Sequence, residues 1–151
     1  MRTLAAVAAV SMLASCRGEP RLDLAAGYTV KLAFGGGSTP FYDSTTIHSD
    51  GRVERQFGGG GRSFTVSGTA EPREIEALRQ SLESDAFASL AGPYREYVAD
   101  AATLDLSVGT ASRELRIRCE GRCGMGELPV ALVSAVQAGV MIRNRATPER
   151  R

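Results

Sequence analysis

Tryptophan is absent from this chain of 151 residues, histidine occurs once, and only 6% of the residues are aromatic. Aromatic cages for cationic ligands and stacking platforms for sugars or bases are therefore not expected. The 18 basic and 17 acidic side chains nearly cancel, which leaves no excess positive charge to attract nucleic acid or to hold a membrane surface. The length allows one domain with a core of its own.

The sequence also lacks an apolar run of the roughly 20 residues that a membrane-spanning helix needs. The run from Leu4 to Leu13 is almost entirely Leu, Ala, Val and Met, and it stops at Cys16. A basic residue, Arg2, precedes the run, and small residues follow it. This layout is typical of a secretory signal peptide, which we expect over residues 1–15.

The segment Leu13-Ala14-Ser15-Cys16 resembles the lipobox of bacterial lipoproteins. The resemblance implies cleavage before Cys16 and acylation of this cysteine by two or three chains. Because each buried methylene contributes about 0.8 kcal/mol, two chains suffice for stable anchoring. Arg17 is not the Asp that favours the inner membrane in enteric bacteria, so we expect a periplasm-facing protein on the outer membrane. The alternative is an ordinary cleaved signal in which Cys16 has no role.

Apolar and polar residues alternate along six stretches of the mature chain, and this period of two predicts strands. The stretches cover residues 28–34, 42–48, 53–57, 64–66, 104–108 and 115–119. Asp50-Gly51 tolerates the positive φ angles of a tight type I′ hairpin, which we expect between the second and third strands. The glycines 58–61 predict another turn, and residues 16–27 a lipidated tether.

Two amphipathic helices are predicted between and after these strands. Pro72 suits a first helical turn, and Ile75, Leu78 and Leu82 share one face. The last helix begins at Pro129, and its expected apolar face consists of Leu128, Leu132, Val133, Val136 and Val140. Between the helices, Phe87 and Leu90 are expected to anchor the first helix to the core, and residues 94–100 to form a connecting loop.

The element order ββββ-α-ββ-α predicts an α+β fold, with an antiparallel sheet of about six strands and two helices packed on one face. The single domain is expected over residues 28–142, followed by a charged tail over residues 143–151.

The order of short motifs resembles a family of uncharacterised bacterial envelope proteins, many of them lipoproteins, that share a domain of unknown function. Its members have a Cys-Phe-Gly-x-Cys-Pro-x-Tyr segment and then an Asp-Gly hairpin. Matching residues span 28–142 and include Phe34, Gly35, Pro40, Tyr42, Asp50, Gly51, Val53, Phe87, Leu90, Tyr94, Asp100 and Thr103. Ala33 and Thr39 stand where the family has its two cysteines. The resemblance implies a fold and an envelope location, and no activity.

Cys119 and Cys123 flank a short loop and have three interpretations. In an oxidising compartment, two spare cysteines usually form a disulfide, and a ring this small stabilises the fold by about 2 kcal/mol or less. A redox role and a metal hook are the alternatives. A structural zinc site needs two further ligands, which no remaining Cys or His pair supplies. We therefore predict no metal and no cofactor.

Catalytic hypotheses depend on His48 and on a few acidic residues. Asp50, Ser44 and Ser49 lie near His48 in sequence, but neighbouring residues of one hairpin rarely assemble a Ser-His-Asp triad. A surface histidine without a special role is the simpler interpretation. Asp43, Asp50, Asp100 and Asp105 are candidates for a hydrolytic carboxylate pair, although acidic turn residues are common background.

Two kinds of segment remain as binding candidates. The glycine runs at 35–37 and 58–61 lack the Gly-Lys-Ser/Thr ending and following helix of a phosphate loop, so a flexible hairpin or mobile binding edge is favoured. Tyr94, Arg95 and Tyr97 are residue types enriched at interfaces, and they equally suit the border of a core.

These patterns favour a non-enzymatic, lipid-anchored module that binds another envelope protein or envelope component through its sheet edge or loops. The alternatives are an envelope hydrolase that uses carboxylates or His48, and a purely structural tethered domain.

Overall fold

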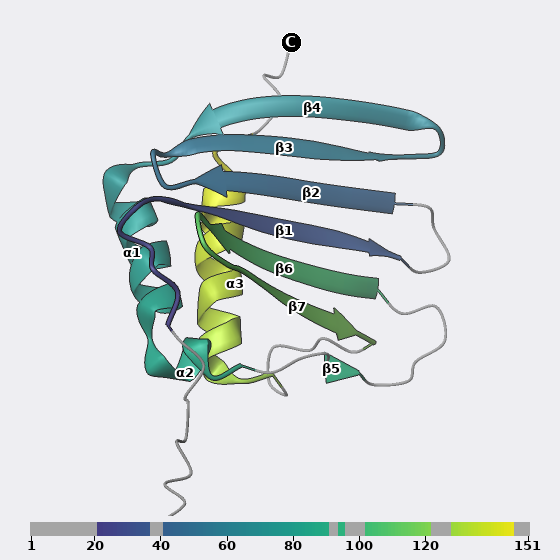
Figure 1. The fold of residues 1–151 in the computed structure, drawn as a ribbon. Helices are drawn as coiled ribbons and strands as arrows, with labels where there is room; N and C mark the ends of the chain where they lie inside the picture. The colour runs from purple at the N-terminus through teal and green to yellow at the C-terminus, as the bar shows by residue number, and fades with distance from the viewer. Residues whose placement is uncertain (1–20, 37–40, 91–93, 96–101, 122–127, 147–151) are drawn as a thin grey trace, which may run out of the picture.

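A computed structural model describes residues 21–36, 41–90, 94–95, 102–121 and 128–146. In this part of the chain a seven-stranded sheet forms one layer, and three helices form a second layer on one of its faces (Figure 1). This architecture confirms the α+β class. None of the helices in the described residues has the length and apolar character needed to cross a membrane.

The strands follow the order β4-β3-β2-β1-β6-β7-β5 in the sheet. Their bounds are β1 (Tyr28–Gly36), β2 (Phe41–His48), β3 (Arg52–Gly59), β4 (Arg62–Thr69), β5 (Tyr94–Arg95), β6 (Ala102–Thr110) and β7 (Glu114–Glu120). The first four strands form the expected antiparallel meander, and the β6–β7 hairpin joins it through antiparallel pairing of β6 with β1. The turn between β2 and β3 is not the predicted type I′ turn, because the N–H of Gly51 donates to His48 O at 2.9 Å and Ser49 and Asp50 are its central residues. Gly51 follows this turn with a φ of 91°.

The expected strand count was too low by one. Residues 94–95 were predicted to lie in a connecting loop, but they form β5, which pairs in parallel with β7. Its two residues are too short to show any periodicity, so only the neighbouring strand identifies it.

The helices are α1 (Pro72–Glu83), α2 (Asp85–Ala88) and α3 (Val130–Arg143). Pro72 opens α1 as expected, and Glu74 Oε2 accepts a hydrogen bond from the backbone N–H of Glu71 at 2.8 Å. The expected helix count was also too low by one, because α2 has a single turn. Ser84 caps α2 through a hydrogen bond from the backbone N–H of Phe87 to its Oγ at 3.1 Å.

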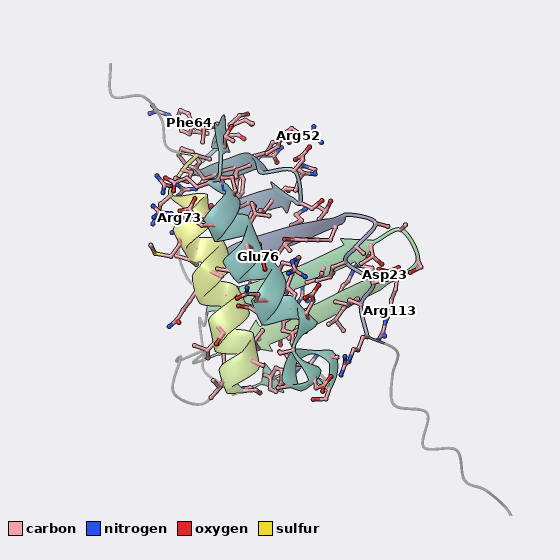
Figure 2. All side chains as sticks on the ribbon, turned by 90° about the vertical axis from the view of Figure 1, so that its left-hand side faces the viewer. Asp23, Arg52, Phe64, Arg73, Glu76 and Arg113 are labelled. Atoms are coloured by element: carbon pink, nitrogen blue, oxygen red, sulfur yellow. The ribbon has the colours of Figure 1, made fainter. Side chains whose placement is uncertain are left out.

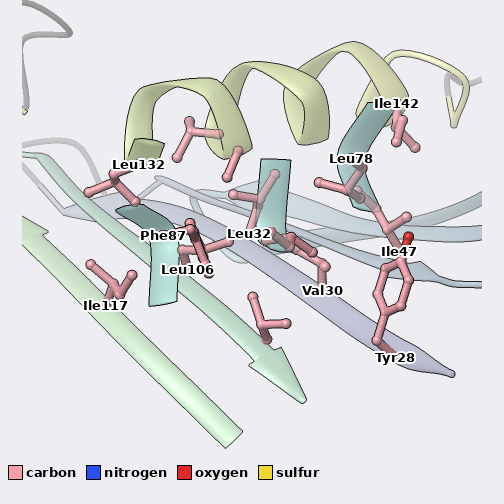
Figure 3. Close-up of a cluster of buried hydrophobic side chains, with 14 of the residues drawn as sticks. Tyr28, Val30, Leu32, Ile47, Leu78, Phe87, Leu106, Ile117, Leu132 and Ile142 are labelled. Atoms are coloured by element: carbon pink, nitrogen blue, oxygen red, sulfur yellow. The ribbon is translucent and has the colours of Figure 1, made fainter. Parts of the chain in front are cut away.

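The core lies between the helices and the sheet (Figure 3). Its largest fully buried side chains are Phe87, Leu32, Ile47, Leu78, Leu82, Leu106, Leu132, Ile142, Val30, Val53, Val108 and Val136. α3 comes very close to the sheet, because a Cβ placed on Gly139 would lie 2.3 Å from Leu32 Cδ1. Leu132 and Val136 are buried as expected, whereas Val133 and Val140 are only half-buried.

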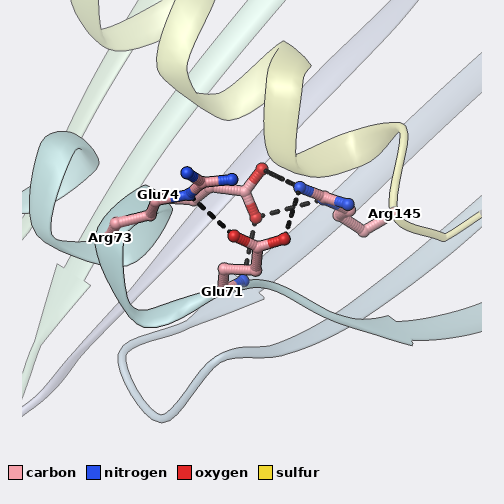
Figure 4. A network of polar contacts seen from close by, with 4 residues as sticks. All are labelled: Glu71, Arg73, Glu74 and Arg145. Carbon is pink, nitrogen blue, oxygen red and sulfur yellow. Dashed lines mark hydrogen bonds and ion pairs between the residues drawn. The ribbon is translucent and has the colours of Figure 1, made fainter.

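The packed unit extends beyond residues 28–142 at both ends. Leu22 and Leu24 are buried, although they belong to the expected tether. At the other end, Arg143 is the last residue of α3 and Ala146 is fully buried. Arg145 then joins the end of α3 to the start of α1 through hydrogen bonds to Glu71 and Glu74 (Figure 4).

Candidate functional site

The Ser-His-Asp hypothesis finds no support in the side chains around His48. Its Nδ1 lies 3.5 Å from Thr29 Oγ1, and Ser49 Oγ accepts a hydrogen bond from the backbone N–H of Tyr28 at 3.2 Å. Asp50 accepts hydrogen bonds from the backbone and then the side chain of Arg52, and these lower the pKa of Asp50. Each group therefore has a separate structural partner.

The carboxylates that are described do not form a pair either. Asp43 lies on the helix-covered face of the sheet and is 3% exposed. Asp105 is paired in register with Ala33 and lies on the opposite, open face. Asp100 lies outside the described residues. Within the described ranges, no three His, Cys, Asp or Glu residues gather to hold a metal ion.

The other predicted site residues are only partly described. Cys119 is buried at the end of β7, while Cys16, Cys123 and Tyr97 lie outside the described residues. Tyr94 packs against the core, as expected of a tyrosine at the border of a core. Arg95 is exposed, and its Nε lies 3.5 Å from Glu120 Oε2.

The open face of the sheet carries small and hydroxyl-bearing side chains, with ion pairs at one side. A trough of about 700 Å³ lies over β1, β6 and β7. Its lining includes Lys31, Asp105 and Ser107. Arg118 donates to Asp105 through Nε at 2.6 Å and Nη2 at 3.0 Å, and Arg116 donates to Glu114 at 2.8 Å, so these charges of the lining are paired with each other.

The helix-covered face carries a different group of charges near one end of the strands. Phe34, Asp43, Phe57 and Phe64 lie side by side in register across β1 to β4. Arg55 donates to Asp43 through Nε at 3.0 Å and Nη2 at 2.7 Å. One arginine of α3 joins Phe34, Asp43, Arg55 and Phe57 in a single cluster.

Arg143 completes this cluster from the end of α3, with its Nη1 3.3 Å from Asp43 Oδ2. The guanidinium carbon of Arg143 lies 5.3 Å from the ring centroid of Phe34, and that of Arg55 lies 4.8 Å from the ring of Phe57. We call Phe34, Asp43, Arg55, Phe57 and Arg143 the arginine–phenylalanine cluster. Both guanidinium groups thus contact one carboxylate and one aromatic face each.

The sheet extends beyond the helices at this end. In Figure 1, α1 and α3 lie behind the left part of the sheet, and β1 to β4 continue to the right of them. Phe41 is 48% exposed and Phe64 is 51% exposed, although both are large apolar side chains. Figure 2 shows Phe64 at the side of the molecule formed by β4, away from Asp23 and Arg113.

Strand β4 is the outermost strand of the sheet, and no other strand of the described residues pairs with its outer edge. Its register with β3 is continuous from Gly59–Arg62 to Arg52–Thr69. Gly60 and Gly61 have φ of 58° and 83°, as a two-residue type I′ turn requires, so the flanking Gly59–Arg62 pair is hydrogen-bonded.

Alternation from that pair assigns the backbone groups that point toward the outer edge of β4. The N–H and C=O groups that face away from β3 belong to Ser63, Thr65, Ser67 and Thr69. The strand contains no Lys, Pro or bulge, which are the usual devices that protect an edge from pairing. Arg62, its only charged residue, lies at its first position.

The arginine–phenylalanine cluster was not predicted from the sequence. One signal was present: Asp43, Thr45 and Ile47 alternate on one face of β2, so an acidic residue occupies a core-facing position. The partner Arg143 is 100 residues away in the chain, and nothing local connects it with Asp43.

Comparison with protein-family models finds no family that matches this chain, and comparison with curated proteins finds no match.

Proposed function

We propose that this protein is a non-enzymatic binding module of the bacterial envelope, which receives an extended segment of another envelope protein along β4. The observation that carries the proposal is the eight-residue edge strand, whose outward N–H and C=O groups pair with no other strand of the described residues. Addition of a strand to such an edge is a common mode of peptide recognition, in which main-chain hydrogen bonds provide the affinity.

The side chains of β4 suit this role. A partner strand next to β4 would meet hydroxyl groups of Ser63, Thr65 and Ser67 on the open face. On the other face it would meet Phe64 and Val66. Alternating polar and apolar contacts of this kind give an extended partner a defined register.

The location belongs to the same proposal. The lipobox-like segment ending at Cys16 and the resemblance to envelope proteins of unknown function support a lipid-anchored, periplasm-facing protein, with the outer membrane favoured. Cys16→Ala is then expected to release the protein from the membrane fraction; retention there would contradict the anchor. A disulfide between Cys119 and Cys123 fits this oxidising compartment and is tested by counting free thiols in the denatured, unreduced protein.

The test of the binding edge is in-cell crosslinking of a copy tagged after Arg151, followed by mass spectrometry of the captured proteins. Thr65→Pro removes an N–H that faces away from β3, so no hydrogen bond within the sheet is lost. We expect the wild type to capture one reproducible envelope protein and Thr65→Pro to lose it.

Thr65→Val is the matched control, because it changes the side chain and keeps the backbone donor. It is expected to capture the same protein as the wild type. Capture of that protein by Thr65→Pro, with unchanged circular dichroism, would show that the partner does not bind through this edge. A wild type that captures no envelope protein would contradict the binding-module proposal itself.

A further inference from the structure

The arginine–phenylalanine cluster contains more positive than negative charge. Asp43 is the only acid that Arg55 and Arg143 contact in the described part of the chain. One carboxylate between two guanidinium groups leaves a formal excess of one positive charge. Arg55 is 17% exposed and Arg143 is 23% exposed, so this charge is only partly solvated. A half-buried, uncompensated cation attracts an anion more strongly than a surface cation does.

The hydrogen bonds divide unequally between the two arginines. Arg55 makes two short bonds to Asp43 and resembles a complete bidentate pair. Arg143 makes one longer bond at 3.3 Å through Nη1, and its Nε is enclosed by protein with no hydrogen-bond partner among the described residues. Buried polar groups are normally paired, so an unpaired donor calls for a reason. The free capacity of the cluster therefore lies on Arg143.

Aromatic rings surround this charge. Phe34 lies beneath Arg143, and Phe57 stacks on Phe64 with ring centroids 5.5 Å apart and planes at 24°. Phe64 and Phe41 are both about half exposed on the same side of the sheet. The positive charge of Arg143 and the exposed rings of Phe64 and Phe41 therefore lie on the same face of the sheet, over strands β1 to β4.

A structural clamp explains only part of this arrangement. The Asp43–Arg55 pair is complete without α3, and Arg143 adds a link between the helix and the sheet. A clamp requires neither the single, long hydrogen bond of Arg143 nor the exposure of Phe41 and Phe64. Both features have a common reason if a ligand with an anionic head and an apolar body covers them.

We propose that the arginine–phenylalanine cluster binds a free single-chain amphiphile with a carboxylate head. The carboxylate accepts hydrogen bonds from the Nη groups of Arg143, since its Nε is closed off from solvent. The apolar chain lies over the exposed rings of Phe64 and Phe41. A monoanion matches the single excess charge of the cluster. The site shares Phe64 with the β4 edge, but its charged contact, Arg143, lies on α3 and takes no part in strand pairing along that edge.

The test is isothermal titration calorimetry with decanoate, below its micelle-forming concentration, on the purified full chain carrying Cys16→Ala. Decanol offers the same chain without a charge, and acetate offers the charge without a chain. We expect decanoate to bind at least about ten-fold more tightly than either, since charge-assisted hydrogen bonds and apolar burial both contribute. Absence of decanoate binding, or equal binding of decanol, would overturn the proposal.

Two variants at the end of α3 provide a matched comparison. Arg143→Gln and Arg145→Gln each remove one positive charge, but Arg145 pairs with Glu71 and Glu74 on α1 (Figure 4). Arg143→Gln is expected to weaken decanoate binding about ten-fold, and Arg145→Gln to leave it unchanged. Equal effects of the two variants would show that only net charge matters and would refute the site.

Arg143→Lys covers the case in which Arg143→Gln fails to fold, which circular dichroism melting would show. Lysine keeps the charge and loses the planar pair of donors. We expect this variant to bind decanoate more weakly than the wild type and more tightly than it binds decanol. If a folded Arg143→Lys binds decanoate as tightly as the wild type, the guanidinium hydrogen bonds proposed here are wrong.

Discussion

The sheet carries the same bidentate aspartate–arginine pair on both of its faces, in very different surroundings. On the helix-covered face, Asp43 and Arg55 are 3% and 17% exposed. On the open face, Asp105 and Arg118 are 36% and 55% exposed. In both pairs the arginine donates through Nε and Nη2 to the two carboxylate oxygens. The two pairs share this geometry and differ in burial and in their third partner, since Asp43 also contacts Arg143 and Arg118 also contacts Glu120.

Burial raises the free-energy cost of removing one partner of an ion pair more than it raises the stability that the intact pair contributes. Charges in a low-dielectric interior lose their hydration, and a partner left alone there has nothing to replace it. An exposed pair returns to water when it breaks, and such pairs typically contribute about 0–1 kcal/mol. The stability of the fold therefore depends more on the carboxylate of Asp43 than on that of Asp105.

The largest effect is expected from Asp43→Asn. This substitution keeps the shape of the side chain but leaves Arg55 and Arg143 without their shared carboxylate. Breaking a buried pair costs about 3–5 kcal/mol, so we expect the free energy of unfolding to fall by about 3 kcal/mol. Urea unfolding followed by far-ultraviolet circular dichroism measures it. A loss below about 1 kcal/mol would mean that the cluster is effectively solvated.

A smaller loss is expected from Gly139→Ala, which tests how tightly α3 covers its face of the sheet. The new Cβ would meet Leu32 Cδ1 at 2.3 Å, and overpacking of this kind costs about 1–3 kcal/mol. Alanine returns up to about 1 kcal/mol of helix propensity. We expect a net loss of about 1–2 kcal/mol in urea unfolding.

The control for this substitution is Gly109→Ala on β6, where the nearest atom would be Thr29 O at 3.9 Å. This is ordinary contact, so we expect a change within about 0.5 kcal/mol. If Gly139→Ala proves as stable as the control, α3 shifts freely away from the sheet.

The smallest effect is expected from Asp105→Asn on the open face. The substitution breaks the exposed pair with Arg118, and we expect the free energy of unfolding to change by less than about 1 kcal/mol. Added salt should reduce even this difference, because exposed charges are screened. A loss as large as that of Asp43→Asn would show that the open face is buried in solution, for example by a partner.

Several elements of the fold were predictable because their signals are local. Alternation identified all strands of the meander and of the second hairpin, and Pro72 and Pro129 marked the two longer helices. The single turn α2 and the two-residue β5 were missed, because neither is long enough to repeat a period. The buried Leu22 and Leu24 were missed because only the packed core shows that this segment is covered.

The candidate sites divide in the same way, into residues that are close in sequence and residues that only the fold brings together. A catalytic hypothesis was based on His48, Asp50 and Ser49 because they are close in sequence. In the structure each of them contacts a separate structural partner. Asp43 and Arg143 are far apart in sequence and come together only when α3 packs on the sheet.

By itself the sequence determined the two periodicities, the hairpin at Asp50-Gly51 and the order of strands and helices along the chain, because these follow from interactions between near neighbours. The tertiary structure decided which strands lie side by side, which face of the sheet is covered, and which strand remains an open edge. It also decided that one carboxylate would lie between two arginines. These outcomes depend on contacts between distant residues, whose energies arise from burial that no local pattern specifies.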